Sequence, residues 1–456
     1  MIEIGIFDTG STDLPHKITA SGVRVIDADL PEVHEAARRL TIAQTRRAVL
    51  ADRLGYDEFW NSEHHFSLEG SELSPNPLQT QTAVAALTKR IRLGQMANII
   101  TWHHPLRLAE QIGILDVLSG GRVDVGLGRG YQSREIDTFG ATYGASTLDQ
   151  ERARAVYEEV HEILIKAWTE DSFSHLGQFF SLPPSWIKWN HAQTIAYFGE
   201  EGRSRSVDDV LKLGPVDPKA SGPELFRSAT TLRQLSVLPQ PVQSPHPPIW
   251  EPFSSDRSIR YAAGHGLNGN FSVLPNKELK EKIAVYMSAA EEAGWPDYQD
   301  RGEFKWGWDG ERRRGVSALR WVHVEEPGVG NLKQATELKE RHQDWFQPFG
   351  NTAFLAPKGQ TRVTPERLVE LGIDLYGTKQ QVLDGLMAMK ETVYAEGDFI
   401  VNLEFEHGVA TYQETEEQMQ YFAEELMPEL RRECGGGPKF PDSNVDLTPG
   451  YPPASA

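Results

Sequence analysis

The segment IRLGQMANIITWHHPLRLAEQIGILDVLSGGRVDVGLGRGYQSREIDTFG, residues 91–140, decides the fold class of this chain. Its hydrophobic pattern predicts a strand over residues 91–100, a helix over 105–118 and a buried strand over 123–127. A Gly-Arg-Gly loop then offers a guanidinium and exposed backbone N–H groups, which suit a phosphate. The segment therefore predicts a β–α–β unit with an anion site at the carboxyl end of a strand.

Strand and helix patterns continue to alternate on both sides of this segment. Further strands are predicted at residues 2–7, 56–61, 248–252, 267–273, 316–325 and 399–405, with helices at 35–54, 77–88, 146–168, 255–264, 276–293, 378–395 and 414–432. Repeated β–α alternation indicates a parallel sheet, and roughly eight units favour a closed (β/α)8 TIM barrel. The alternative is an open doubly wound sheet, but the glycines from Gly126 to Gly130 fit the GxGxxG spacing of such folds poorly.

Two stretches interrupt the alternation. Residues 169–237 predict a large insertion, or lid, after the fourth βα unit, and residues 295–315 form a shorter irregular insertion rich in Trp and Arg. Residues 433–456 are rich in Gly and Pro, which predicts a disordered, flexible tail. The expected organisation is therefore one barrel domain over residues 1–432 followed by this tail.

Composition excludes several classes of function. The chain has 456 residues and a formal net charge of −19, which disfavours binding to nucleic acid or to an anionic membrane surface. Cys434 is the single cysteine, so an intrachain disulfide is impossible. The N-terminus lacks a signal-peptide pattern, and no apolar run is long enough to span a bilayer. We therefore expect a cytoplasmic enzyme.

Polar side chains gather where strands are predicted to end. Glu63, His64 and His65 follow one strand, and Asp8 and Ser11 follow the first strand, where they are candidates for a substrate pocket by position. An imidazole there could transfer a proton, although a structural network with Glu63 is the alternative. A metal site is disfavoured because adjacent histidines at a strand end point to opposite sides.

Several ordered blocks resemble the luciferase-like flavin-dependent monooxygenases, the family of bacterial luciferase. They are RLGYDEFWNSEHHF (53–66), LTKRIRLG (87–94), HHPLRLAEQIGILDVLSGGRVDVGLGRG (103–130), PQPVQSPHPPIWEPFSS (239–255), YGT (376–378) and EELMPEL (424–430). The resemblance runs from the first strand to about residue 432 and leaves both irregular stretches unmatched.

The resemblance implies a (β/α)8 barrel that uses reduced FMN, delivered by a separate NAD(P)H:flavin reductase. The reduced flavin and O2 would oxygenate a small organic substrate through a C4a-(hydro)peroxyflavin. It also implies a homodimer formed by early barrel helices. Two alternatives stay open: hydride transfer with deazaflavin F420, which related barrels use, and a non-catalytic FMN-binding protein.

The resemblance also assigns roles to residues. It implies that Arg129, with Gly128, Gly130, Ser254 and Ser255, holds the FMN phosphate, an anion that an Arg fork binds bidentately. His64 matches the catalytic histidine, with Glu63 and His65 as supports. His104 matches a recurring histidine near the cofactor, and Trp102 lies beside it as a candidate for lining the substrate pocket. Met96 and Ala97 match the place where relatives carry a non-prolyl cis peptide beneath the flavin ring.

Some residues depart from the luciferase pattern. Gly128 stands where luciferase has a cysteine before the phosphate-binding arginine, so thiol effects on the flavin do not apply here. The DTGSTDLP segment after the first strand and the two insertions have no counterpart there. The identity of the substrate and the type of oxygenation therefore do not follow from the resemblance.

Overall fold

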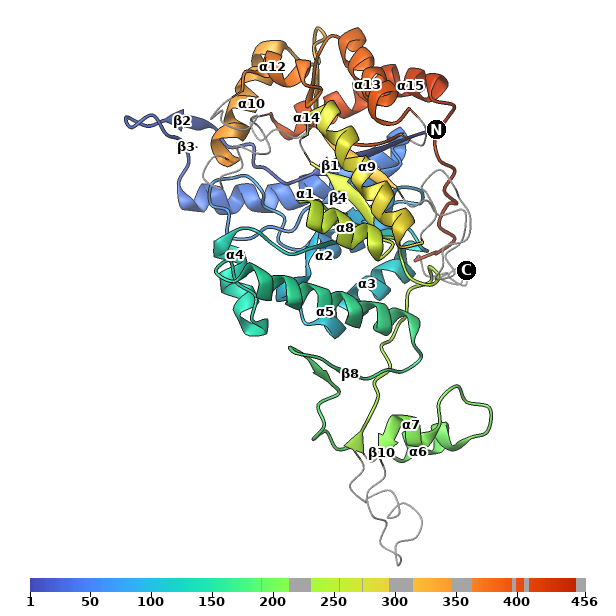
Figure 1. Ribbon diagram of the computed structural model, residues 1–456. Helices are drawn as coiled ribbons and strands as arrows, with labels where there is room; N and C mark the ends of the chain where they lie inside the picture. The colour runs from blue at the N-terminus through green and yellow to red at the C-terminus, as the bar shows by residue number, and fades with distance from the viewer. Residues whose placement is uncertain are drawn as a thin grey trace, which may run out of the picture. The chain divides into compact units, whose positions relative to one another are not determined.

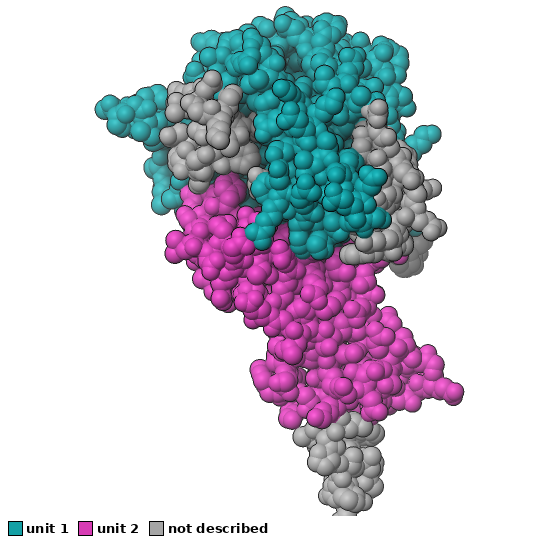
Figure 2. Space-filling model, viewed as in Figure 1, with its two compact units in different colours: residues 1–98, 118–128, 247–456 teal, residues 99–117, 129–246 magenta. Residues whose placement is uncertain are grey.

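The computed structural model describes residues 1–189, 191–212, 231–253, 255–272, 274–294, 315–346, 363–395, 399–405 and 410–447 (Figure 1). The chain divides into two compact units, coloured separately in Figure 2. Unit 1 comprises residues 1–98, 118–128 and 247–456, and unit 2 comprises residues 99–117 and 129–246.

Unit 1 contains a closed parallel barrel. Its ring follows the order β12-β13-β14-β16-β1-β4-β5-β7, and β7 pairs with β12 to close it. The strands are β1 (Ile2–Asp8), β4 (Glu58–Asn61), β5 (Arg92–Gln95), β7 (Val123–Gly128), β12 (Ile249–Pro252), β13 (Asn268–Phe271), β14 (Val316–Val324) and β16 (Phe399–Glu404). In addition, β15 (Asp374–Gly377) pairs with the second half of β14, and β6 (Asn98–Ile99) extends the sheet beside β7. The predicted (β/α)8 barrel is confirmed.

Helices of unit 1 surround these strands. They are α1 (Leu30–Leu54), α2 (Pro77–Leu87), α8 (Asp256–Gly264), α9 (Asn276–Glu292), α10 (Leu332–Phe346), α12 (Pro365–Glu370), α13 (Lys379–Val393), α14 (Tyr412–Tyr421), the π-helical turn η5 (Phe422–Leu426) and α15 (Met427–Glu433). In Figure 1, α8 and α9 lie side by side. A short antiparallel hairpin of β2 (His16–Ile18) and β3 (Arg24–Ile26) stands between β1 and α1.

Unit 2 contains some of the helices predicted for the barrel, together with the insertion. It holds η1 (Ile100–Trp102), α3 (Pro105–Ser119, whose last two residues belong to unit 1), α4 (Ser133–Phe139), η2 (Gly140–Tyr143) and α5 (Gln150–Thr169). The insertion adds β8 (His175–Leu176), β9 (Ser181–Leu182), α6 (Ala192–Gly199), α7 (Val207–Val210), β10 (Leu211–Lys212) and β11 (Thr231–Leu232). Unit 2 therefore begins well before residue 169, whereas most of the 295–315 insertion lies outside the described residues.

Three predicted boundaries differ from the structure for local reasons. The strand expected over residues 91–100 is interrupted at Met96–Ala97, which separates β5 from β6. Helix α1 starts earlier than expected because Asp29 caps it by accepting from the backbone N of Glu32 at 2.9 Å. Helix α5 starts later than residue 146 because Asp149 is its N-cap, while Asp137 accepts hydrogen bonds from Ser146 and Thr147.

The tail expected to be flexible is described as far as residue 447. The backbone N of Ile2 donates to the carbonyl of Gly436 at 2.9 Å, and the backbone N of Ser443 donates to that of Lys89 at 2.8 Å. The guanidinium of Arg92 lies 5.1 Å from the ring centroid of Phe440. Because Ile2 and Arg92 begin β1 and β5, this segment crosses the amino-terminal end of the barrel.

Buried charges lie at the same end of the barrel. Arg92 Nε donates to Asp124 Oδ2 at 2.5 Å, and Trp60 Nε1 donates to Glu58 Oε2 at 2.9 Å. Burial raises the pKa of Glu58 to about 8, and the nearby Asp124 carboxylate acts in the same direction. Glu58 therefore keeps its proton in the folded chain at pH values where an exposed glutamate is ionised.

Glu58 should make the stability of the barrel depend on pH. Its pKa in the folded chain is about 8, above the ordinary value of 4.5. The protonated carboxyl therefore adds to the stability of the folded chain below pH 4.5, and this contribution is lost as the pH rises from 4.5 to about 8. We expect the unfolding free energy of the wild type to fall as the pH rises from about 4.5 to about 8, as measured by urea unfolding. The unfolding free energy of Glu58→Gln should fall less over the same pH range. Equal slopes of unfolding free energy against pH in the two proteins would contradict the assignment to Glu58.

Candidate functional site

Two imidazole–carboxylate pairs stand at the carboxyl end of barrel strand β4. His64 Nε2 lies 3.6 Å from Glu72 Oε1, and His65 Nε2 lies 3.4 Å from Glu63 Oε1. The side chains of His64 and His65 are 12% and 15% exposed, and both carboxylates are more deeply buried. The sequence predicted Glu63 as the partner of a histidine, but it did not identify Glu72.

The loop that carries Glu72 is fixed by backbone hydrogen bonds to the segment after β1. The backbone N of Thr12 donates to Gly70 O at 2.8 Å, and that of Leu73 donates to Gly10 O at 2.7 Å. Within the loop, the backbone N of His64 donates to Ser74 O at 3.1 Å. Glu72 has a φ of 54°, in the left-handed region. The chain therefore turns back so that Glu72 reaches the imidazole of His64.

This arrangement suits proton transfer. A histidine changes charge near neutral pH, and a carboxylate beside one ring nitrogen orients the ring and favours its protonated form. The positions at the end of β4 place both rings at the face where (β/α)8 barrels hold their reactive groups. The site can therefore accept or release a proton at this end of the barrel.

Asp8 and Ser11 were predicted to line a substrate pocket. The Asp8 carboxylate instead accepts from Arg47 Nε at 2.7 Å and from Gln44 Nε2 at 3.0 Å, and its side chain is only 2% exposed. These contacts tie β1 to α1, so they account for Asp8 as a buried structural ion pair. Ser11 is also buried.

Met96 and Ala97 lie between β5 and β6 and are buried. The peptide bond between them is cis, as the family resemblance implied for this position. The backbone N of Met96 donates to Asn61 O at 2.8 Å, so the segment is joined to the end of β4. The adjacent Asn98 side chain donates to Gly126 O at 3.1 Å.

Gly126 allows β7 to pass close to this segment. A methyl group at Gly126 would lie 1.7 Å from the carbonyl oxygen of Gln95, a distance that no side chain tolerates. Gly128, the last residue of β7, is buried.

Ser255 is the N-cap of α8. Its hydroxyl accepts from the backbone N of Ser258 at 3.3 Å, and Ser258 Oγ accepts from the backbone N of Ser255 at 3.1 Å. Ser255 therefore caps α8, and this role is compatible with an anion at the same helix end. Ser254 lies outside the described residues.

Arg129, Gly130, Trp102 and His104 belong to unit 2. Thr101 Oγ1 donates to the carbonyl of Arg129 at 2.9 Å. Gly130 has a φ of 82°, and a methyl group there would lie 2.9 Å from Ile99 Cγ2 and 3.2 Å from Trp102. Glycine at position 130 therefore lets the Arg129 turn lie close to η1, because any other residue would be strained there.

The two aromatic candidates of unit 2 lie among other rings. Trp102 is 8% exposed, and its ring lies 5.8 Å from that of Phe139, which gives it a packing role. His104 lies 6.5 Å from the ring of Tyr143 and 6.2 Å from that of Phe180. Burial lowers the pKa of His104, so its imidazole stays neutral at neutral pH.

Comparison with known proteins agrees with this geometry. The model of the luciferase-like monooxygenase family matches residues 34–231. The chain is 32% identical to the uncharacterized protein y4vJ of Sinorhizobium fredii over 38% of this chain and 51% of that protein. It is 23% identical to the oxygenase component of a flavin-dependent trigonelline monooxygenase of Acinetobacter baylyi, over 77% of this chain and 81% of that one.

A solved structure shows the same fold. The oxygenating constituent of 3,6-diketocamphane monooxygenase from Pseudomonas putida, in complex with FMN, superposes with a TM-score of 0.62 at 17% identity. The match covers 94% of this chain and 98% of that one. The chain matches only about half the length of y4vJ.

Residues 34–231 thus match the luciferase-like monooxygenase family, which is the family that the motifs predicted. Within the described part of the chain, none of the helices has the length and apolar character that a bilayer crossing needs.

If Asp8 is structural, its loss should affect stability and leave cofactor binding intact. Asp8→Ala leaves the buried Arg47 without this partner, so we expect a loss of about 3–5 kcal/mol in unfolding free energy by urea denaturation. Asp27→Ala is the matched control, because Asp27 is 51% exposed in its pair with Lys17 and should cost under about 1 kcal/mol. Equal losses in the two variants would contradict the structural role of Asp8.

Proposed function

We propose that this protein is the oxygenase component of a two-component flavin-dependent monooxygenase. It takes reduced FMN from a separate NAD(P)H:flavin reductase and uses O2 to oxygenate a small organic substrate. The observation that carries the proposal is the pair of imidazole–carboxylate contacts, His64–Glu72 and His65–Glu63, at the end of barrel strand β4.

The comparisons support each part of this assignment. The match to the luciferase-like monooxygenase family over residues 34–231 favours flavin-dependent oxygenation. The trigonelline relative is named as an oxygenase component, a name that favours a reductase on a second chain. The solved diketocamphane relative holds FMN on the same fold, which supports a flavin as the cofactor.

The side chains present fit FMN. Arg129 follows β7 and offers a fork of N–H donors for a phosphate, held by the Thr101 contact and the Gly130 turn. Ser255 stands at a helix N-terminus, where backbone N–H groups also favour an anion. Among the described residues, the buried Nδ1 of His104 has no hydrogen-bond partner, and a polar group of a bound ligand would supply one.

Met96 and Ala97 would support the flavin ring. Bound reduced flavin supplies the electrons that activate O2. In this account His64 holds or releases a proton near the reacting atoms, Glu72 orients its ring, and Glu63 does the same for His65. Carboxylate partners of this kind keep an imidazole in one orientation. A cytoplasmic homodimer completes the proposal by analogy with the family.

The phosphate assignment predicts the effect of removing one guanidinium. Arg129→Ala should weaken FMN binding by about tenfold or more, because a bidentate charged contact is lost, and Arg129→Lys should recover only part of it. Equilibrium titration of FMN by flavin fluorescence measures both. Arg107→Ala is the control in the same unit, since Arg107 is 73% exposed and pairs with Glu110 on the helix surface. An Arg129→Ala protein with wild-type affinity would overturn the phosphate site.

The histidine assignment predicts a change in the pH profile of oxygen chemistry. In His64→Asn, the rate at which O2 reoxidises bound FMNH2 should lose an inflection between about pH 5 and 8 and should change by about tenfold or more at the wild-type optimum. Glu72→Gln should shift that inflection and leave FMN affinity unchanged. Stopped-flow absorbance measures the rates, with Glu35→Gln on the exposed face of α1 as the control. Profiles identical to that of the wild type would remove His64 from the chemistry.

A further inference from the structure

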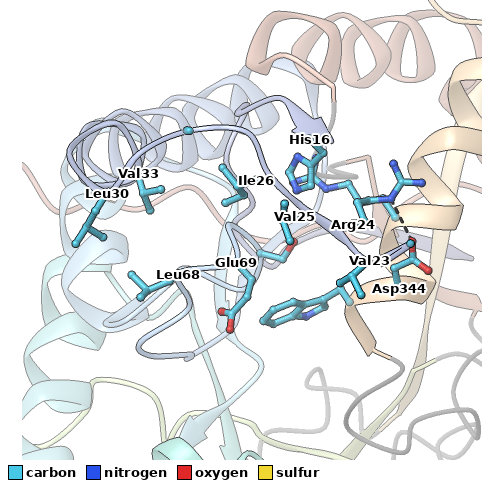
Figure 3. Close-up of a pocket in the computed structure, with 15 residues that line it drawn as sticks. His16, Val23, Arg24, Val25, Ile26, Leu30, Val33, Leu68, Glu69 and Asp344 are labelled. Carbon is cyan, nitrogen blue, oxygen red and sulfur yellow. Dashed lines mark hydrogen bonds and ion pairs between the residues drawn. The ribbon is translucent and has the colours of Figure 1, made fainter. Parts of the chain in front are cut away.

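Unit 1 contains a cavity that no part of the proposed flavin site uses. Its volume is about 690 Å³, and it is bounded by the β2–β3 hairpin, the start of α1, the loop after β4 and α10 (Figure 3). A volume of this size is typical of sites for small organic molecules, which span about 300–1,000 Å³. The hairpin lies before residue 34, where the match to the family model begins.

One end of the cavity is apolar. Leu30 and Val33 from α1 face Leu68 from the loop after β4, and they lie together on one side of Figure 3. Leu30 and Leu68 are 52% and 59% exposed, so apolar surface remains open to solvent at this end. An apolar ring or branched chain placed here would remove that surface from water.

The other end carries two guanidinium groups. Arg24 and Arg341 line it together with His16 and Asp344, as Figure 3 shows for His16, Arg24 and Asp344. Arg24 Nε donates to Asp344 Oδ2 at 3.1 Å, and another of its nitrogens lies 3.9 Å from Glu340 Oε2. The Arg24 side chain is 23% exposed, so a ligand that enters the cavity can reach it.

The imidazole of His16 also lines this end of the cavity. Its Nδ1 lies 3.0 Å from Leu14 O, and because a carbonyl only accepts, this nitrogen carries the proton. Burial, followed by the charge of Arg341, lowers the pKa of His16 to about 4, and Arg24 acts in the same direction. His16 is therefore neutral at neutral pH, and the charged groups around it are the guanidinium groups of Arg24 and Arg341 and the carboxylates that face Arg24.

We propose that this cavity is a second binding site, which takes a small organic anion with an apolar ring or branched body. The apolar body lies against Leu30, Val33 and Leu68, and a carboxylate or sulfonate group lies against Arg24. The exposed Glu69 also lines the cavity and disfavours ligands with more than one negative charge. The site needs no flavin, so it stands or fails separately from the proposed monooxygenase activity.

A pair of fluorescent probes tests both halves of the proposal. 1-Anilinonaphthalene-8-sulfonate has an apolar body and one sulfonate, and N-phenyl-1-naphthylamine is its counterpart without the charge. We expect the folded full-length protein to bind one equivalent of the sulfonate probe, and to bind it more tightly than the neutral probe. Because partly folded proteins also bind such dyes, cooperative urea unfolding of each variant is measured in parallel.

Three substitutions and one control substitution assign the binding to this cavity. Val25→Trp, which fills the cavity from β3, should abolish binding of both probes, whereas Val369→Trp on the surface of α12 should have no effect. Arg24→Met should weaken binding of the sulfonate probe by about tenfold and binding of the neutral probe by less than about twofold. Asp344→Asn removes the carboxylate that competes for Arg24, so it should strengthen binding of the sulfonate probe.

The proposal fails if the folded Val25→Trp protein binds the sulfonate probe as the wild type does. It also fails if Arg24→Met weakens both probes equally, because the anion would then have no place at the guanidinium end. Weaker binding of the sulfonate probe by Asp344→Asn would show that the carboxylate does not compete with the ligand, and this outcome too would overturn the assignment.

Discussion

The hydrogen bonds between the segments after β1 and β4 are the constraint on which the proposed site depends. Through Thr12 to Gly70 and Leu73 to Gly10, two chain segments that are far apart in sequence hold one another at the end of the barrel. That connection places Glu72 beside His64. Since the same loop also supplies Leu68 to the second cavity, it contributes to both sites proposed in unit 1.

The charged groups at the two ends of the barrel strands differ in their burial and in their partners. At the amino-terminal end, Glu58 is buried and keeps its proton, and the tail segment covers Arg92. At the end of β1, Asp8 forms a buried ion pair with Arg47. The imidazole–carboxylate pairs after β4 retain partial exposure, which a group that exchanges protons with a ligand requires. Stability and proposed chemistry thus use different carboxylates.

The sequence predicted the barrel because β–α alternation is a local signal repeated along the chain, and it predicted that Glu63 would support a nearby histidine because those residues are neighbours in the chain. It missed Glu72, whose approach to His64 depends on contacts with the segment after β1, and it missed the ion pair of Asp8 with Arg47, which lies on the next helix. The β2–β3 hairpin was also missed, since its strands are too short to show a period. These features arise from tertiary contacts, which no local pattern records.

The central claim is that the barrel binds reduced FMN and presents it to O2. The most direct measurement mixes the purified protein with FMNH2 or with reduced F420 under anaerobic conditions and then records O2 uptake after rapid addition of oxygenated buffer. We expect stoichiometric binding of FMNH2 and O2 consumption that differs in rate from that of free FMNH2. Absence of any effect on FMNH2 oxidation, together with hydride transfer from reduced F420 to an organic acceptor, would contradict it.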